Sequence, residues 1–206
     1  MEKGKRAREG KMKGGKRGMF LLPSLIFLFS SALGAWFGQE TCSSHYAVGT
    51  GYADAQRFQA PEDGNSSYLE ILTSGETGAG AFRMAVYDDS SGHPNHKLWE
   101  GTSLSYAAGQ WCGEDVTTIS ISKDSYYWFA FKTNASEDMC YSGASPANSH
   151  EWKSGQTYSN SFPNPWGGYT GHNANRYTMR MYYSTPGGSK GIIEIDPGII
   201  EGGIER

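Results

Sequence analysis

The chain has 206 residues, of which only 19% are charged, and it is rich in aromatic side chains, with 9 Phe, 6 Trp and 13 Tyr. This composition excludes an intrinsically disordered protein, and the length suits one domain with a core of its own. The net charge of −3 conceals an asymmetry, because residues 1–18 carry 8 Lys or Arg against 2 Glu. The rest of the chain is therefore acidic, which argues against nucleic acid as a partner.

The first predicted element is a secretory signal peptide over residues 1–34. The basic segment 1–18 precedes a short apolar run at 19–29, and small residues two positions apart follow, the second of them Gly34. This order is typical of a signal peptide that is cleaved after Gly34. A membrane-spanning helix and a pilin-type signal cut before Met19 are the alternatives, but a spanning helix needs about 20 apolar residues. We therefore expect a secreted protein that is not stably inserted in a membrane after cleavage.

The body of the chain favours β-structure, because short runs alternate between apolar and polar residues and no helical period is sustained. Residues 126–131 are apolar on both faces, which is typical of a central strand that is covered on both sides. About eight strands are expected, at residues 68–72, 81–87, 97–100, 103–106, 115–122, 126–131, 139–142 and 176–183. Short strands with Gly-rich turns predict an all-β domain over residues 35–184, a two-sheet antiparallel jelly-roll-like β-sandwich.

The three cysteines indicate one disulfide, because an exported chain meets an oxidising environment. Cys112 and Cys140 flank the most apolar strand and are the predicted pair, which leaves Cys42 free or bonded to another chain. Asn65 and Asn134 begin N-glycosylation sequons in predicted polar loops.

Several segments of the body carry a resemblance to a known class of modules. They lie at residues 82–98, 116–122, 126–131, 161–166 and 177–183. In this order they resemble secreted β-sandwich modules that are similar to carbohydrate-binding domains and occur in extracellular surface and phage-tail proteins. The resemblance covers residues 53–184. It implies a β-sandwich and an extracellular location, and it implies no particular activity and no catalytic residue.

Aromatic residues at strand ends or in loops are the candidates for binding sugars, because exposed rings stack on the apolar faces of sugars. These residues are Trp99, Trp111, Trp152, Trp166 and Tyr169. Packing in the core is the alternative for Trp111 and Trp152. Trp166 lies in a Pro- and Gly-rich segment, so we expect it to be partly exposed.

Candidates for catalysis are few. Asp88 and Asp89, in a turn expected at residues 88–95, are candidate calcium ligands, although Asp in turns also bonds locally. Residues 194–201 approach the carboxylate spacing of some jelly-roll glycosidases, but Pro197 interrupts the alternation. The five histidines lack the spacing of a metal or catalytic motif and are interpreted as polar loop residues. We therefore expect no enzyme and no cofactor other than calcium.

The C-terminal segment is interpreted as a Gly-rich linker at residues 185–191 and a β-strand tail at residues 192–206. The tail is apolar on one side and contains Ile192, Ile193, Ile195, Ile199 and Ile200. The apolar side of such a strand must be buried, either against the sheet of its own domain or against a neighbouring subunit that accepts the strand by β-augmentation.

The leading functional hypothesis follows from this tail. Head-to-tail strand donation would build a homo-polymer, so we expect a secreted structural subunit of an extracellular filament. The alternative is a carbohydrate-binding adhesion module with glycans as partners, and a glycoside hydrolase comes third.

Overall fold

The computed structural model describes residues 34–75, 80–142, 146 and 148–185. The chain divides into the units Met1–Ser30 and Ser31–Arg206, and all described residues belong to the second unit. Apart from Gly34 and Thr185, the predicted signal peptide, linker and isoleucine tail lie outside the described residues. Within the described part, no helix has the length and apolar character needed to cross a membrane.

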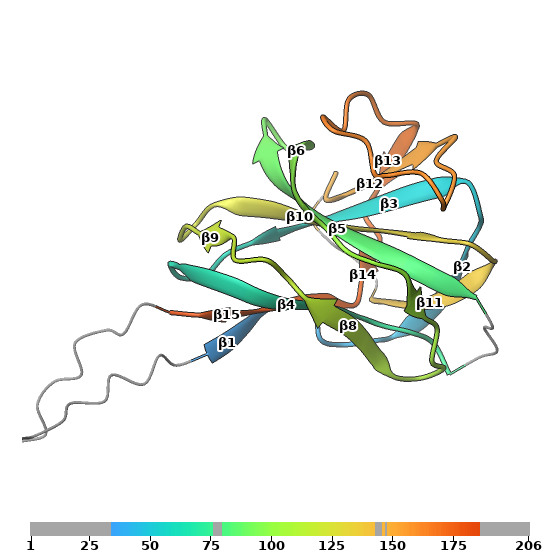
Figure 1. Ribbon diagram of the computed structural model, residues 1–206, viewed down its shortest axis with the longest axis horizontal. Coiled ribbons are helices and arrows are strands. Elements are labelled where there is room, and N and C mark those ends of the chain that lie inside the picture. The colour runs from blue at the N-terminus through green and yellow to red at the C-terminus, as the bar shows by residue number, and fades with distance from the viewer. Residues whose placement is uncertain (1–33, 76–79, 143–145, 147, 186–206) are drawn as a thin grey trace, which may run out of the picture. The chain divides into compact units, whose positions relative to one another are not determined.

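The described residues form fifteen strands in three antiparallel sheets and no helix, which confirms the all-β sandwich (Figure 1). The first sheet has the order β1 (Gly34–Gly38), β15 (Met179–Ser184), β4 (Gly64–Leu72), β8 (Trp111–Asp115), with β9 (Ser120–Ile121) also on β4. The second has the order β13 (Gly171–Asn173), β12 (His150–Ser154), β3 (Tyr52–Gln59), β10 (Tyr126–Thr133), β5 (Ala81–Ser90), β6 (His93–Glu100), with β7 (Leu104–Ser105) on β5. The third has the order β14 (Arg176–Tyr177), β11 (Glu137–Ser142), β2 (Ser44–Val48).

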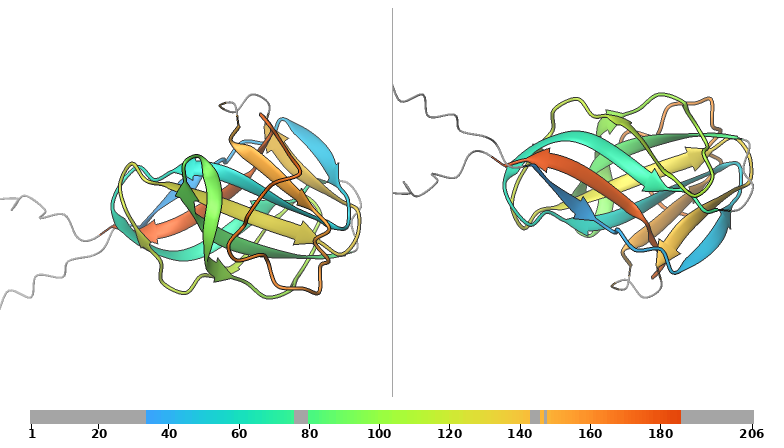
Figure 2. Two further views of the ribbon diagram at one scale, coloured as in Figure 1. Left: turned by 90° about the horizontal axis from the view of Figure 1, so that it is seen from above. Right: turned by 90° about the horizontal axis from the view of Figure 1, so that it is seen from below.

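The main core lies between the first and second sheets, which face each other as two layers in Figures 1 and 2. β10 is paired on both sides, with β3 and β5, as expected for the apolar run at 126–131. Its alternate side chains Phe129 and Phe131 enter the main core, while Trp128 points to the opposite face. Met179 and Met181 of β15 approach the same core from the first sheet.

The outer face of the second sheet is covered by a strap, residues 155–170, which crosses it in orange in the left view of Figure 2. Small side chains make room for the strap, at Ala53, Ala55, Ala85 and Ala130. Into this space the strap inserts Phe162 and Trp166, beside Tyr87 and Trp128. The expectation that Trp166 is partly exposed is wrong, since its side chain is 0% exposed and meets Tyr87 edge to face at 5.2 Å.

Cationic side chains of the second sheet hold the backbone of the strap. Lys97 donates to the carbonyl of Phe162 over 2.9 Å, and Lys153 donates to that of Trp166. Lys132 donates to the carbonyl of Thr157 over 3.3 Å. These charge-assisted hydrogen bonds satisfy carbonyls that no strand pairing reaches.

The structure corrects the expected strand at 115–122. β8 ends at Asp115, residues 116–119 form no strand, and the ladder with β4 resumes at Ser120 and Ile121 of β9. The strands β1, β2, β3, β12 and β13 were not expected from the sequence. The sequence pattern did not reveal β3 and β12 because polar side chains occupy inward-facing positions on them. These side chains interrupt the alternation of apolar and polar residues that predicts a strand.

The predicted Cys112–Cys140 disulfide is also wrong. Cys140 is bonded to Cys42, with a Cα–Cα distance of 5.3 Å, and Cys112 is free. The reason is topological, because β11 pairs with β2 in the third sheet and Cys42 lies just before β2. Cys112 lies on β8 in the first sheet, opposite Ile71.

Candidate functional site

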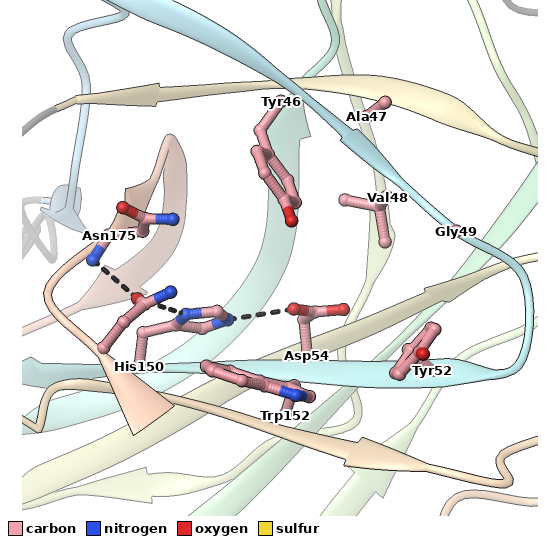
Figure 3. A pocket seen from close by; sticks show the side chains of 10 residues that line it. Tyr46, Ala47, Val48, Gly49, Tyr52, Asp54, His150, Trp152 and Asn175 are labelled. Carbon is pink, nitrogen blue, oxygen red and sulfur yellow. Dashed lines mark hydrogen bonds and ion pairs between the residues drawn. The ribbon is translucent and has the colours of Figure 1, made fainter. Parts of the chain in front are cut away.

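A cleft of about 260 Å³ opens where the second and third sheets diverge (Figure 3). The alternation of β3 and β12 places its polar side chains, because Ala53 and Ala55 face the strap while Asp54 faces the third sheet. In the same way His150 and Trp152 of β12 face the cleft. Trp152 is the ladder partner of Asp54, so these side chains are neighbours on one face.

A chain of buried hydrogen bonds forms the floor of the cleft. Asp54 and His150 are 6% and 2% exposed, and Oδ1 of Asp54 lies 2.9 Å from Nε2 of His150. Nδ1 of His150 lies 2.7 Å from Oδ1 of Asn173, and that oxygen also accepts the backbone N–H of Asn175 over 2.8 Å. Both ring nitrogens of His150 thus face an oxygen atom, and the two contacts fix the orientation of the ring.

Tyr177 adds a further donor to this floor. Its hydroxyl donates to Oδ1 of Asp54 over 3.5 Å. Burial first, and then the charge of Asp54, raises the pKa of the Tyr177 hydroxyl well above its ordinary value, so it stays protonated. Oδ2 of Asp54 has no hydrogen-bond partner among the described residues and points away from His150 in Figure 3. The floor thus offers the cleft one oriented carboxylate oxygen that can accept a hydrogen bond.

Aromatic side chains form the walls. Tyr46 and Tyr52 are 51% and 41% exposed, and Trp152 is partly buried. Figure 3 shows the hydroxyl of Tyr46 directed into the cleft, with Trp152 on the opposite side. Among the described residues that line the cleft there is no Ser, Thr or Cys nucleophile. The arrangement is suited to holding a polar ligand that has an apolar face.

The structure separates the aromatic residues that the sequence proposed for sugar binding. Trp152 alone lines the cleft. Trp99 packs against the main core, and Trp111 lies on β8 in the first sheet. Trp166 is buried beneath the strap, and Tyr169 is 43% exposed on the opposite side of the second sheet. These five rings therefore do not form one surface.

Sequence reasoning missed most residues of the cleft, including Tyr46, Tyr52, Asp54 and both asparagines. The interpretation of the five histidines as loop residues is wrong, because all of them lie on strands, and His150 on β12 is also buried. The signal that was available is the spacing of His150 and Trp152, two residues apart after a polar segment. It predicts a strand with both side chains on one face.

The candidate calcium ligands Asp88 and Asp89 lie at the end of β5 and not in a turn, and both accept hydrogen bonds. Asp89 accepts from Nε of Arg57 over 2.7 Å and from the backbone N–H of Gly92 over 3.1 Å. Asp88 accepts the backbone N–H of His96 over 2.6 Å. These contacts match the alternative interpretation, in which Asp stabilises the turn itself.

The two N-glycosylation sequons lie in different structural elements. Asn65 is exposed but lies on β4, opposite Ser184, and not in a loop. Asn134 is exposed in the β10–β11 turn, where its Oδ1 accepts the backbone N–H of Ala81 over 2.7 Å.

One further group of potential metal ligands surrounds the disulfide. Nδ1 of His45 lies 4.0 Å from the sulfur of Cys42 and 3.8 Å from that of Cys140. The two sulfurs are bonded to each other, so they offer no thiolates while the disulfide is intact.

Comparison with known proteins gives information on the fold. No family model matches the sequence, and no curated protein matches it. The fold is similar to a solved structure of the clostridial cysteine protease Cwp84 after propeptide cleavage, with a TM-score of 0.53 and 9% identity. The match covers 74% of this chain and 40% of that one, so this chain spans less than half of the length of the protease. At this identity the similarity shows the fold alone.

This comparison overturns the expectation of a filament subunit joined by strand donation. The similar solved structure belongs to a protease and not to a filament. The tail at residues 192–206, which was expected to be donated, lies outside the described residues.

Proposed function

We propose that the domain is a binding module that holds one sugar residue of a glycan in the cleft. The observation that carries this proposal is the oriented Asp54–His150–Asn173 chain, which lies beneath the aromatic walls. A sugar ring combines an apolar face, which stacks on aromatic side chains, with hydroxyl groups, which donate to carboxylates and exchange hydrogen bonds with amides. The cleft supplies both kinds of partner.

The size and charge of the cleft support a sugar over larger or anionic ligands. Its volume of about 260 Å³ is at the small end of ligand sites, which suits a single ring. The unpartnered Oδ2 of Asp54 accepts from a hydroxyl group and repels phosphate or carboxylate. The Asn173 amide can donate through Nδ2, since its Oδ1 already has two partners, and the Asn175 amide can both donate to and accept from a sugar hydroxyl.

We also propose that the protein acts outside the cytoplasm. The Cys42–Cys140 disulfide supports this location, because structural disulfides persist in oxidising compartments. The basic segment and the apolar run within residues 1–34, which are typical of a signal peptide, also support export from the cytoplasm.

The test compares two exposed tyrosines on opposite faces of the second sheet. The wild-type chain is screened on an array of mono- and oligosaccharides, and affinities for the bound glycans are measured by titration calorimetry. Tyr52→Ala should weaken binding about tenfold or more, since the loss of one stacking ring amounts to at least about 1.4 kcal/mol. Tyr169→Ala is the matched control, because the two side chains are 41% and 43% exposed, and it should bind like the wild type.

Two results would contradict the proposal. The absence of binding to every glycan on the array would refute the function. Loss of binding in Tyr169→Ala with full binding in Tyr52→Ala would place the site on the strap side and refute the assignment to the cleft.

A further inference from the structure

The carboxylate of Asp54 is bonded through one of its two oxygens. Its contacts with Nε2 of His150 and with the hydroxyl of Tyr177, at 2.9 and 3.5 Å, are both made by Oδ1. Oδ2 has no hydrogen-bond partner among the described residues, and the Asp54 side chain keeps only 8% of its exposure. Because removing a carboxylate from water is costly unless donors replace the water, a ligand in the cleft binds best when it brings a donor to Oδ2.

The lining of the cleft favours a cationic donor over a neutral one. No Lys or Arg is among the described residues that line it, so no such cation balances the charge of Asp54 from within the cleft. An ammonium group that reaches Oδ2 makes a hydrogen bond and also meets an opposite charge. Charge-assisted hydrogen bonds of this kind are roughly twice as strong as neutral ones.

The aromatic walls add a second attraction for a cation. Trp152 is the ladder partner of Asp54, and the rings of Tyr46 and Tyr52 are exposed at the cleft. Opposite residues on one face of a sheet have Cβ atoms about 4.5–5.5 Å apart, so the indole lies beside the carboxylate (Figure 3). Aromatic ring faces attract cations as well as the apolar faces of sugars. Together, the carboxylate and the rings favour a sugar that carries a positive charge.

We propose that the sugar held in the cleft is an amino sugar with a free amine, whose ammonium group bonds to Oδ2 of Asp54. This inference rests on the proposed function and specifies the class of sugar. Acetylation removes the charge and adds an acetyl group, for which a cleft of about 260 Å³ leaves little room beside a ring. A neutral hexose keeps the shape of the amino form but donates to Oδ2 without a charge. The cleft should therefore bind the amino form more tightly than either.

Matched sugars test this preference without any change in the protein. The probes are glucosamine, galactosamine and mannosamine, each with its parent hexose and its N-acetyl form, titrated at about pH 6.5, where amines are protonated and carboxylates are ionised. At least one amino form should bind about tenfold more tightly than its parent hexose and its N-acetyl form, because a charged hydrogen bond replaces a neutral one. Methylammonium, which carries the charge without the ring, should bind more weakly than this amino sugar.

The variant Asp54→Asn assigns the preference to this carboxylate. Its amide oxygen can still accept from His150 and Tyr177, whereas the charge is lost. The amino form and its parent hexose should then bind within about threefold of each other. Asp115→Asn removes an exposed carboxylate of β8, in the first sheet, and should keep the wild-type preference. The comparison of sugars on the wild type stands by itself if Asp54→Asn fails to fold.

Three results would overturn the amino-sugar assignment and leave the proposed function intact. They are equal or tighter binding of the parent hexoses, a preference that persists in Asp54→Asn, and failure of all the probes while other glycans on the array bind. Methylammonium that binds as tightly as the amino sugar would overturn both, because the cleft would then be a site for cations and not for sugars.

Discussion

Trp128 donates its indole N–H to Oδ1 of Asp89 over 2.8 Å, and the same oxygen accepts from Nε of Arg57. The bond ties the outer face of the central strand β10 to the end of β5, where the chain turns into β6. Asp89 thereby connects three neighbouring strands of the second sheet, β3, β10 and β5.

Asp89→Ala should lower the free energy of unfolding by about 2–4 kcal/mol, because it leaves the buried indole N–H and the Arg57 guanidinium without their acceptor. Urea unfolding measures the change. Asp88→Ala is the matched control and should cost about 1 kcal/mol or less, since Asp88 accepts one backbone N–H near the surface. Equal losses in the two variants would contradict the role given to Asp89.

Trp166→Ala should cost about 3–5 kcal/mol of stability, because a fully buried indole leaves a cavity between the strap and the sheet. Glycan binding in the cleft should be unchanged in the folded fraction of this variant. Tyr169→Ala, three residues further on, removes a 43% exposed ring that stacks on His93 and His172, and should cost about 1 kcal/mol or less. A variant at position 166 that keeps full stability would show that the strap does not seal the outer face.

Lys132 should make stability depend on pH. Burial lowers the pKa of its ammonium group to about 8, so between that pH and its ordinary value of 10.5 the unfolded chain binds more protons than the folded one. The free energy of unfolding should therefore increase with pH, by about 1–2 kcal/mol between about pH 8 and pH 9.5.

Comparison with Lys132→Met isolates this group, because every other titrating residue is common to both proteins. The difference between their urea unfolding curves should change with pH over this interval and stay constant below about pH 7. Parallel pH dependences of the two proteins would refute the shift.

The Cys42–Cys140 disulfide leads to a prediction about the free energy of unfolding. Cys42→Ser should lower the free energy of unfolding by about 2–5 kcal/mol, since the bond closes a loop with a sequence separation of 98 residues. Cys112→Ser should change it by less than about 1 kcal/mol. Peptide mapping of the wild type should find Cys42 linked to Cys140 and one free thiol, whereas a Cys112–Cys140 peptide would disprove the pairing.

Sequence patterns predicted the strands in which each face carries side chains of one kind, either apolar or polar. β10 is apolar on both faces and was predicted nearly at its observed bounds. The strand expected at 176–183 is divided into β14 in the third sheet and the strictly alternating β15 in the first. β3 and β12 were missed because Asp54, Gln56 and His150 face inward. Asp54 and His150 bond to each other, and Gln56 donates to the carbonyl of Ser149, only in the folded protein. The polar residues that interrupt the hydrophobic pattern of these strands include Asp54 and His150, which form the floor of the cleft.

The remaining errors have the same physical origin. Whether an aromatic ring is exposed depends on what covers it, and the strap that buries Trp166 is held by lysines on distant strands. Likewise, the cysteine pairing depends on the β2–β11 ladder, which brings Cys42 to Cys140 from far along the chain. Local patterns carry no information on such contacts.

The β1–β15 ladder has a consequence for the modular use of this fold. Gly34 and Ser184 are ladder partners, so the first and last described strands end next to each other, at the spacing of neighbouring strands, about 5 Å. Two ends this close fit into one surface turn of a host protein, where an inserted domain does not force the flanking residues apart. They can equally be joined by a short peptide while new ends are opened in another exposed turn. The architecture is thus suited to domain insertion and to circular permutation with all its strand pairings intact.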